Sequence, residues 1–262
     1  MPALTKPNHW LKLLQRRHKF SDCQDYLDYC RLNNVSLGTS TFKGTLYEIA
    51  TEKFLEKRLH CFNMKRIGGS LDLGVDILGK WNLLHYWNDL NTKPTELKNT
   101  KVQNTNTLPL LKYSQEYNNW VSEMTGTKSV KKNLLSLADG VNLLVQCKSY
   151  NTRVKPSVVR EIAGVYQQLV KREHETLPTF MFLISPYPLT KHALNLLNSL
   201  SIPLIHCSLS PMKYQSGNIY LIDDWAGGHL NYIYMNYMSR ALFEGLHMEF
   251  QFEKLKQSCI SD

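Results

Sequence analysis

Short apolar runs alternate with helical patterns between residues 141 and 206. The runs Val141–Val145, Thr179–Ser185 and Ile202–His206 have the length of buried strands. Helical patterns lie between them, from Pro156 to Lys171 and from about Thr190 to Leu200, and proline suits the first turn of a helix. Strands that alternate with helices build an α/β sheet in which part of the strand pairing is parallel. This order therefore predicts an α/β fold.

A helix and a short strand are expected before this region. Residues Thr41 to Leu59 repeat apolar side chains at helical spacing, and Thr41 can cap the start. Gly68-Gly69-Ser70 predicts a turn, and Gly74–Leu78 predicts a short buried strand. The chain would thus enter the sheet through a helix and a turn.

The segment between residues 82 and 139 has a different composition from the rest. It is rich in Asn, Thr and Lys with little apolar periodicity, which predicts a long insertion, and 108–124 could add a helix there. Beyond the sheet, 219–223 is strongly patterned, and a helix is expected near 237–246. We therefore divide the chain into a basic segment (1–40), an α/β domain (41–225, insertion 82–139) and a C-terminal extension (226–262).

The first 21 residues carry basic side chains and no acidic one. Trp10 and several leucines are interleaved with them, so the stretch can form an amphipathic, cationic helix. Such a start is typical of a mitochondrial import signal, and it could also support peripheral contact with an anionic membrane. An ordinary basic helix is the alternative. We predict a mitochondrial protein.

Charge and cysteine usage narrow the class of partner. Lys and Arg number 31 against 22 Asp and Glu, a formal charge of +9 that suits a polyanion such as nucleic acid or an anionic membrane surface. The six cysteines show no zinc-ligand spacing and are expected to behave as small apolar residues. No apolar stretch approaches the ~20 residues of a transmembrane helix. The sequence does not indicate an oligomeric state.

Three separated elements could build one metal site. Asp76 places a carboxylate within an apolar strand, where it requires a cation or a metal. Gln146 and Lys148 lie two apart in a strand and so project from one face. Glu48 lies on the preceding helix. The alternative for Asp76 and Lys148 is a plain buried salt bridge.

Phosphodiester cleavage would need these residue types. A divalent cation offsets charge on the phosphate and lowers the pKa of the attacking water. Magnesium, or manganese, prefers a few oxygen ligands, which Asp76, the Gln146 amide and the Cys147 backbone carbonyl could supply. Lys148 would orient or deprotonate the water or stabilise the transition state, and Glu48 would assist as an accessory ligand.

These motifs resemble a known family. Gly44-x-x-Tyr-Glu48, Gly69-Ser-Leu-Asp-Leu-Gly-Val-Asp76 and Val145-Gln-Cys-Lys-Ser-Tyr150 resemble the Mrr-type branch of the PD-(D/E)XK nucleases. Their order in a small basic chain is similar to the fungal mitochondrial family called required for respiratory growth protein seven. The resemblance covers residues 43–205 and implies a restriction-endonuclease-like mixed sheet flanked by helices.

The same resemblance assigns roles to individual residues. It implies that Asp76, Gln146 and Lys148 are catalytic, that Glu48 is accessory, and that Asp72 shapes the glycine-rich loop. One departure is Gln146, which stands where much of the wider superfamily has an acidic residue. A neutral amide attracts a metal cation less strongly than a carboxylate does, so the affinity for the metal should be lower.

Two functional hypotheses follow. The first is a magnesium-dependent nuclease acting on DNA or RNA in mitochondria, and the second is a non-catalytic nucleic-acid-binding or scaffold protein of the same fold. In both, Arg153, Lys155 and Arg160 would contact the phosphate backbone, since they follow the Gln-x-Lys strand. Four histidines lack ligand spacing and are expected to be structural: His174, His192, His206 and His229.

Overall fold

The computed structural model describes residues 20–67, 74–86, 140–170, 179–243 and 246–261, and the backbone of two short paired strands. The helices are α2 (Cys23–Leu32), α3 (Ser40–Leu59), α6 (Pro156–Val170), α7 (Lys191–Ser199), α8 (Tyr237–Leu242) and α9 (Met248–Ser261). The strands are β1 (Cys61–Arg66), β2 (Ile77–Trp81), β3 (Thr107–Leu108), β4 (Leu135–Ser136), β5 (Val141–Cys147), β6 (Thr179–Ser185), β7 (Leu204–Leu209), β8 (Lys213–Tyr214), β9 (Trp225–Ala226) and β10 (Leu230–Met235). The basic start (1–19), the glycine turn at 68–70, Asp72, Lys171, His174 and the expected helix at 108–124 lie outside the described residues.

The central sheet is mixed. Its strand order is β1-β2-β5-β6-β7-β10. The first three strands pair antiparallel, β5, β6 and β7 pair parallel, and β10 closes the other edge antiparallel to β7. Helices α6 and α7 connect the parallel strands, as the alternation of strands and helices predicts. The expected mixed α/β sheet is therefore confirmed.

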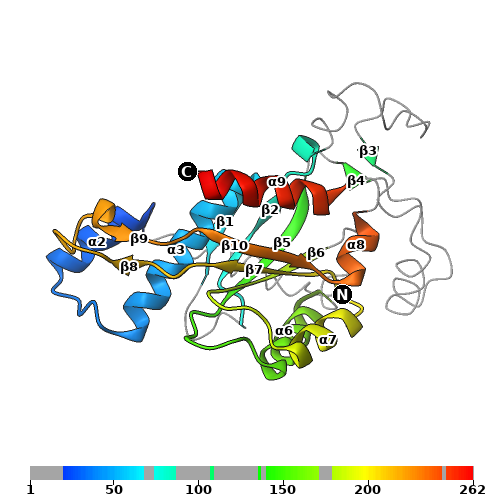
Figure 1. Cartoon of the computed structure of the whole chain (residues 1–262), viewed down its shortest axis with the longest axis horizontal. Coiled ribbons are helices and arrows are strands. Elements are labelled where there is room, and N and C mark those ends of the chain that lie inside the picture. The colour runs from blue at the N-terminus through cyan, green and yellow to red at the C-terminus, as the bar shows by residue number, and fades with distance from the viewer. Residues whose placement is uncertain are drawn as a thin grey trace, which may run out of the picture.

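Helices cover both faces of this sheet. Alternate residues of β5 separate the two layers: Leu144 belongs to the apolar cluster under α6 and α7, whereas Val145 belongs to the cluster under α3, α8 and α9. Figure 1 shows α9 on one side of the strands and α6 and α7 on the other. No described helix is long and apolar enough to cross a membrane.

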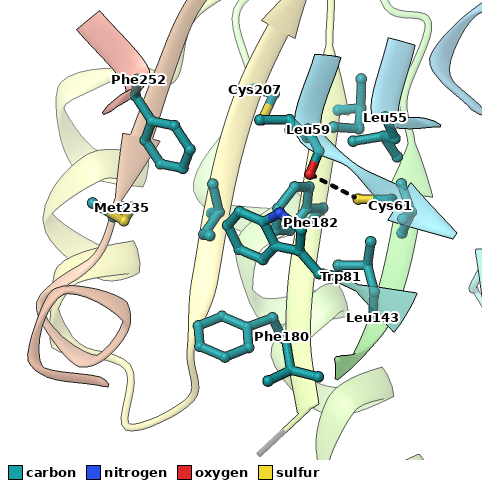
Figure 2. Close-up of a cluster of buried hydrophobic side chains, with 14 of the residues drawn as sticks. Leu55, Leu59, Cys61, Trp81, Leu143, Phe180, Phe182, Cys207, Met235 and Phe252 are labelled. Carbon is teal, nitrogen blue, oxygen red and sulfur yellow. Dashed lines mark hydrogen bonds between the residues drawn. The ribbon is translucent and has the colours of Figure 1, made fainter. Parts of the chain in front are cut away.

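Trp81 is the centre of the layer beneath α9. Its side chain is fully buried, and its ring centroid lies 5.1 Å from that of Phe182 and 5.2 Å from that of Phe243. The ring of Phe252, from α9, is stacked on it at 6.2 Å. Figure 2 shows Trp81 among side chains from the sheet and from α9. Helix α9 therefore packs on the middle of the sheet through Trp81 of β2.

Helix α3 carries Glu48 and links two cores. Its N-cap is Thr39, whose side chain accepts a hydrogen bond from the Phe42 N–H, so the expected cap at Thr41 is wrong by two residues. The first half of α3 packs on α2 through Phe42 and Leu46, in a separate apolar cluster. Its second half packs on the sheet through residues that include Leu55 and Leu59. The long helix therefore holds Glu48 between the two cores.

Several strand boundaries differ from the expected ones. Strand β2 begins at Ile77 instead of residue 74, because Gly74 has a φ of +79°, which is incompatible with extended backbone. Strand β7 begins after Pro203, which has no N–H to give to a ladder. The patterned run at 219–223 forms a turn followed by a 3-10 helix, η1 (Ile222–Asp224), between β8 and β9.

The sequence pattern missed β1, β10 and α9. The residues after 226, expected as an extension, supply the edge strand β10 and two helices that pack on the same sheet. The expected helix near 237–246 is shorter, ending at Leu242. Leu83 and Tyr86, directly after β2, are buried in the core, although they fall within the range expected as the insertion (82–139).

Candidate functional site

Gln146 and Lys148 project from one face of β5, as their spacing predicts, toward α6. Glu161, on α6, accepts a hydrogen bond from the Gln146 Nε2 at 3.2 Å and forms an ion pair with the Lys148 Nζ at 2.9 Å, both through its Oε1. Sequence reasoning missed Glu161. Its spacing could have revealed it. Glu161 lies three residues after the buried Val158 and four before the half-buried Val165, so it shares the face of the helix that packs on the sheet.

The Gln146 side chain leaves one polar atom unsatisfied. Only 3% of the residue is exposed, and its Oε1 has no hydrogen-bond partner among the described residues. The amide orientation is fixed, because a carboxylate can accept only from the NH₂ end of the amide. A buried oxygen without a donor costs about 1–3 kcal/mol. The amide oxygen is therefore available to a cation or a water.

Asp76 lies immediately before β2 and beside β5. Its N–H donates to the Val145 carbonyl at 2.9 Å, although the ladder already pairs Val145 with Ile77. Two consecutive residues thus face one partner, a bulge-like step that redirects a side chain. The Asp76 Oδ2 accepts a 2.6 Å hydrogen bond from the Cys147 N–H. Backbone N–H groups of a strand point in the plane of the sheet, toward the neighbouring strand. The Asp76 carboxylate therefore lies in that plane, at the strand end and between the two faces of the sheet.

Lys148 is held in its charged form. Burial alone would lower its pKa, but the hydrogen bond and charge of Glu161, with smaller contributions from Tyr150 and Asp76, raise the pKa above its ordinary value. The ion pair of Lys148 is made with Glu161, whereas Asp76 bonds to the backbone of β5. A lysine that keeps its proton can stabilise negative charge, but it is unsuited to deprotonating a water near neutral pH.

Glu48 approaches from the opposite side of β5. It is half-buried on α3. Burial and then the negative charges of Asp76 and Glu48 raise the pKa of the Cys147 thiol well above its ordinary value. Because side chains alternate along a strand, Cys147 faces away from Gln146 and Lys148. Asp76 thus bonds to the Cys147 backbone, the charges of Glu48 and Asp76 both act on the Cys147 thiol, and Gln146 and Lys148 meet at Glu161.

The oxygen atoms at this strand end match the donor set that a hard divalent cation prefers. Asp76 offers one carboxylate and Gln146 a buried unpaired amide oxygen, and both adjoin the Cys147 backbone. No group of three or more His, Cys, Asp or Glu side chains close enough to hold a metal occurs among the described residues. A carboxylate, an amide oxygen and a backbone carbonyl are oxygen ligands of the kind that a magnesium-type ion accepts.

The predicted phosphate-binding residues surround the site on exposed positions. Arg153 and Lys155 lie in the loop between β5 and α6, and Arg160 lies on the outer side of α6. All three side chains are exposed. They are therefore accessible from solvent, and their role in binding phosphate stays a prediction.

His206 forms a buried hydrogen-bond network at the ends of β6 and β7. Its Nε2 lies 2.8 Å from the Ser185 Oγ and its Nδ1 2.7 Å from the Tyr232 hydroxyl. Ser185 donates to the Tyr187 carbonyl, so Ser185 must accept from the imidazole Nε2–H. The Tyr232 hydroxyl then donates to Nδ1, and every polar group of the network has a partner. Burial lowers the pKa of His206 to about 3, which makes it a neutral structural residue.

This network predicts a pH-dependent stability. The pKa of His206 rises on unfolding from about 3 to its ordinary value of 6.5. His206 therefore costs no stability above pH 6.5, and between its two pKa values it lowers the free energy of unfolding by about 1.4 kcal/mol per pH unit as the pH falls. We expect urea unfolding between pH 7 and 5 to show a smaller loss of stability in His206→Gln than in the wild type. Exposed His192→Gln is the control, and equal slopes in all three proteins would contradict the prediction.

The fold and the site together define a mixed α/β protein with an Asp, Gln, Lys and Glu cluster at the carboxyl end of a central strand. The chain belongs to the family described as Required for respiratory growth protein 7, whose model matches residues 39–243. No solved structure matches the chain.

Curated relatives come from several yeasts, and each is named Required for respiratory growth protein 7, mitochondrial. The Vanderwaltozyma polyspora protein is 32% identical over 87% of this chain and 86% of its own length. The Candida glabrata protein is 26% identical over 91% of this chain and 88% of its own, and a Saccharomyces cerevisiae protein 29% over 80% and 82%. These names support the predicted mitochondrial location. The protein is mitochondrial.

Proposed function

We propose that this protein is a nuclease of the PD-(D/E)XK type that cleaves nucleic-acid phosphodiester bonds in mitochondria with the help of Mg²⁺ or Mn²⁺. The order of elements supports the proposal: a helix with Glu48, then an antiparallel β1-β2-β5 unit with Asp76 and the Gln146/Lys148 pair, then α6 and the parallel β6. Within it, the order of the helix Glu, the Asp strand and the Gln-x-Lys strand is the motif order of the Mrr-type branch that the sequence resembles.

One observation carries the proposal. The Gln146 Oε1 is buried without a hydrogen-bond partner among the described residues, on a strand end that also presents the Asp76 carboxylate and the Lys148 ammonium. A purely structural glutamine would be expected to satisfy its buried oxygen from within the fold. A buried acceptor at a strand end that also presents a carboxylate is an arrangement that a cation could complete.

Each residue then has a defined role. Asp76, the Gln146 amide oxygen and the Cys147 carbonyl would hold the cation, which supplies positive charge to the phosphate and acidifies a water. Lys148 remains an ammonium and stabilises the negative charge that develops on the phosphate. Glu161 is a positioning residue, since one of its oxygens holds both Gln146 and Lys148. Glu48 would act from the α3 side as an accessory group.

A non-catalytic nucleic-acid-binding protein of the same fold is the second candidate. The observation that favours it is the donor set: Gln146 is neutral, and no cluster of three acidic or other strong ligands occurs in the described ranges. Fewer charged ligands weaken the binding of a divalent cation. Such a protein would use its exposed basic residues for binding and would leave the phosphodiester intact.

Cleavage assays on purified full-length protein separate the two candidates. End-labelled single- and double-stranded DNA and RNA are incubated with Mg²⁺, with Mn²⁺ or with EDTA, and the products are resolved on denaturing gels. We expect metal-dependent products from at least one substrate, and none with EDTA. Salt-sensitive binding without cleavage under either metal would reject the nuclease and support the binding protein.

A further inference from the structure

Two loops at the carboxyl ends of the parallel strands form one continuous surface beside Lys148. The loop after β5 and the loop after β6 are joined by backbone hydrogen bonds: Val154 N to Pro188 O and Thr190 N to Val154 O, each 3.0 Å. Lys148 N also donates to Ile184 O at 2.8 Å. Ligands of α/β sheets bind outside the carboxyl ends of such strands. We call Tyr150, Arg153, Lys155 and Tyr187 on these loops the tyrosine rim.

The two tyrosines of the rim are unusually open for large aromatic side chains. Tyr150 is 41% exposed and Tyr187 39%. Tyr150 adjoins the candidate site, because its N–H donates to the Lys148 carbonyl at 2.8 Å and its phenol contributes to the raised pKa of Lys148. Neither ring is needed to fill the core. Each is a large aromatic side chain that solvent reaches on the loops at the carboxyl ends of the parallel strands.

The loop that carries Tyr187 is rigidly supported from below. The Ser185 Oγ donates to the Tyr187 carbonyl at 2.8 Å, and the Ser208 Oγ donates to the Pro186 carbonyl at 3.0 Å. The Leu189 N–H donates to the Tyr232 hydroxyl, which itself bonds to the buried His206. A platform held in place in the free protein loses little conformational entropy when a ligand binds. The buried network around His206 thus preorganises an exposed aromatic residue.

Positive charge lies on the same surface. Arg153 and Lys155 are exposed in the loop after β5. The charge of Arg153 also lowers the pKa of Tyr232, whose hydroxyl accepts from the Leu189 N–H in the second loop, although burial raises that pKa overall. Aromatic faces next to exposed cations are the combination that binds single-stranded nucleic acid, because unpaired bases stack on the rings while phosphates meet the cations. In a duplex the base faces are already stacked on one another and are not available.

We infer that the tyrosine rim binds single-stranded nucleic acid, with bases stacked on Tyr150 and Tyr187 and the backbone held by Arg153 and Lys155. The inference rests on the proposed function, in that it names the form of substrate delivered to Lys148. It predicts a preference for single strands over duplexes of the same sequence, and a preference that depends on the two rings.

Fluorescence anisotropy of the full-length protein with labelled oligonucleotides in EDTA tests the rim without cleavage. We expect Tyr150→Ala and Tyr187→Ala each to weaken single-strand binding by about tenfold or more, since stacking is lost. Tyr150→Phe and Tyr187→Phe keep an aromatic face and should bind within about twofold of the wild type. Tyr237→Ala, at a tyrosine that is 59% exposed on α8, is the matched control and should have no effect.

The outcomes separate this inference from the proposed function. Three results would overturn the inference that the tyrosine rim binds single strands. They are equal affinity for duplex and single strand, no binding at all, and unchanged binding by both Ala variants. Ring-dependent single-strand binding by a protein that cleaves nothing with Mg²⁺ or Mn²⁺ supports the rim and rejects the nuclease. If the Ala variants cleave with metal as the wild type does, the proposed nuclease function is supported and single-strand binding by the rim is rejected. Weakened binding by Phe variants of unchanged thermal stability also rejects stacking.

Discussion

Asp76→Asn and Lys148→Met should each lower metal-dependent cleavage by about 100-fold or more. The Asn side chain can still accept the hydrogen bond from the Cys147 N–H, so the sheet edge is kept while the negative charge is lost. The Met side chain keeps the length of the lysine stem but removes the ammonium, and Glu161, whose side chain is 47% exposed, remains hydrated. Initial cleavage rates under saturating Mg²⁺ measure both effects.

Matched surface variants show whether the effect is specific to the site. Asp223→Asn and Lys213→Met make the same chemical changes at exposed positions of the segment that runs from β8 to η1. We expect them to cleave at the wild-type rate. If the Asp76 and Lys148 variants retain wild-type rates, cleavage does not take place at this strand end. If all four variants lose activity together, the assay reports charge or stability and not catalysis.

Trp81→Ala should lower the free energy of unfolding by about 3–5 kcal/mol. The indole is fully buried and contacts aromatic rings from β6 and α9, so its removal leaves a cavity that rigid neighbours cannot fill. Domains of this kind are stable by only about 5–15 kcal/mol, and the loss is therefore a large share of the total. Urea unfolding followed by circular dichroism gives the change in midpoint.

Helix α9 provides the control for this second prediction. Phe252 is 4% exposed and stacks on Trp81, whereas Phe250, two residues earlier, is 56% exposed. Phe252→Ala should destabilise the protein in the same direction as Trp81→Ala. Phe250→Ala should shift the free energy by no more than about 0.5 kcal/mol. A Trp81→Ala protein that unfolds at the wild-type urea concentration would show that α9 does not pack on the sheet as described.

The sequence predicts the middle of the fold well and its edges poorly. From β5 to β7 the strands are buried on both faces, so each appears as an apolar run, and amphipathic helices separate the three runs. Strand β1 lacks such a run, because Asn63, Lys65 and Arg66 interrupt it. Strand β10 contains two half-buried tyrosines and an exposed Asn231. Edge strands bury less surface, and their partners come from distant parts of the chain, so local patterns do not reveal them.

The candidate site is only partly visible in the sequence. The period of two in a strand is enough to predict that Gln146 and Lys148 share a face. The role of Glu161 depends on how α6 packs over β5, and periodicity alone does not give the angle of that packing. The position of Asp76 at the edge of the sheet depends on the irregular pairing of Asp76 and Ile77 with Val145. The functional assignment of these residues stays a prediction until the cleavage experiments are done.

The order of elements along the chain also has a consequence for how the protein matures. The ring of Phe252 that stacks on Trp81 belongs to a helix that is synthesised after every strand of the central sheet. Until α9 has been made, the indole and its neighbouring phenylalanines form an exposed apolar surface that is prone to aggregation. A premature stop codon or a proteolytic cut before residue 246 would leave these rings exposed, so quality control of this protein should depend on α9.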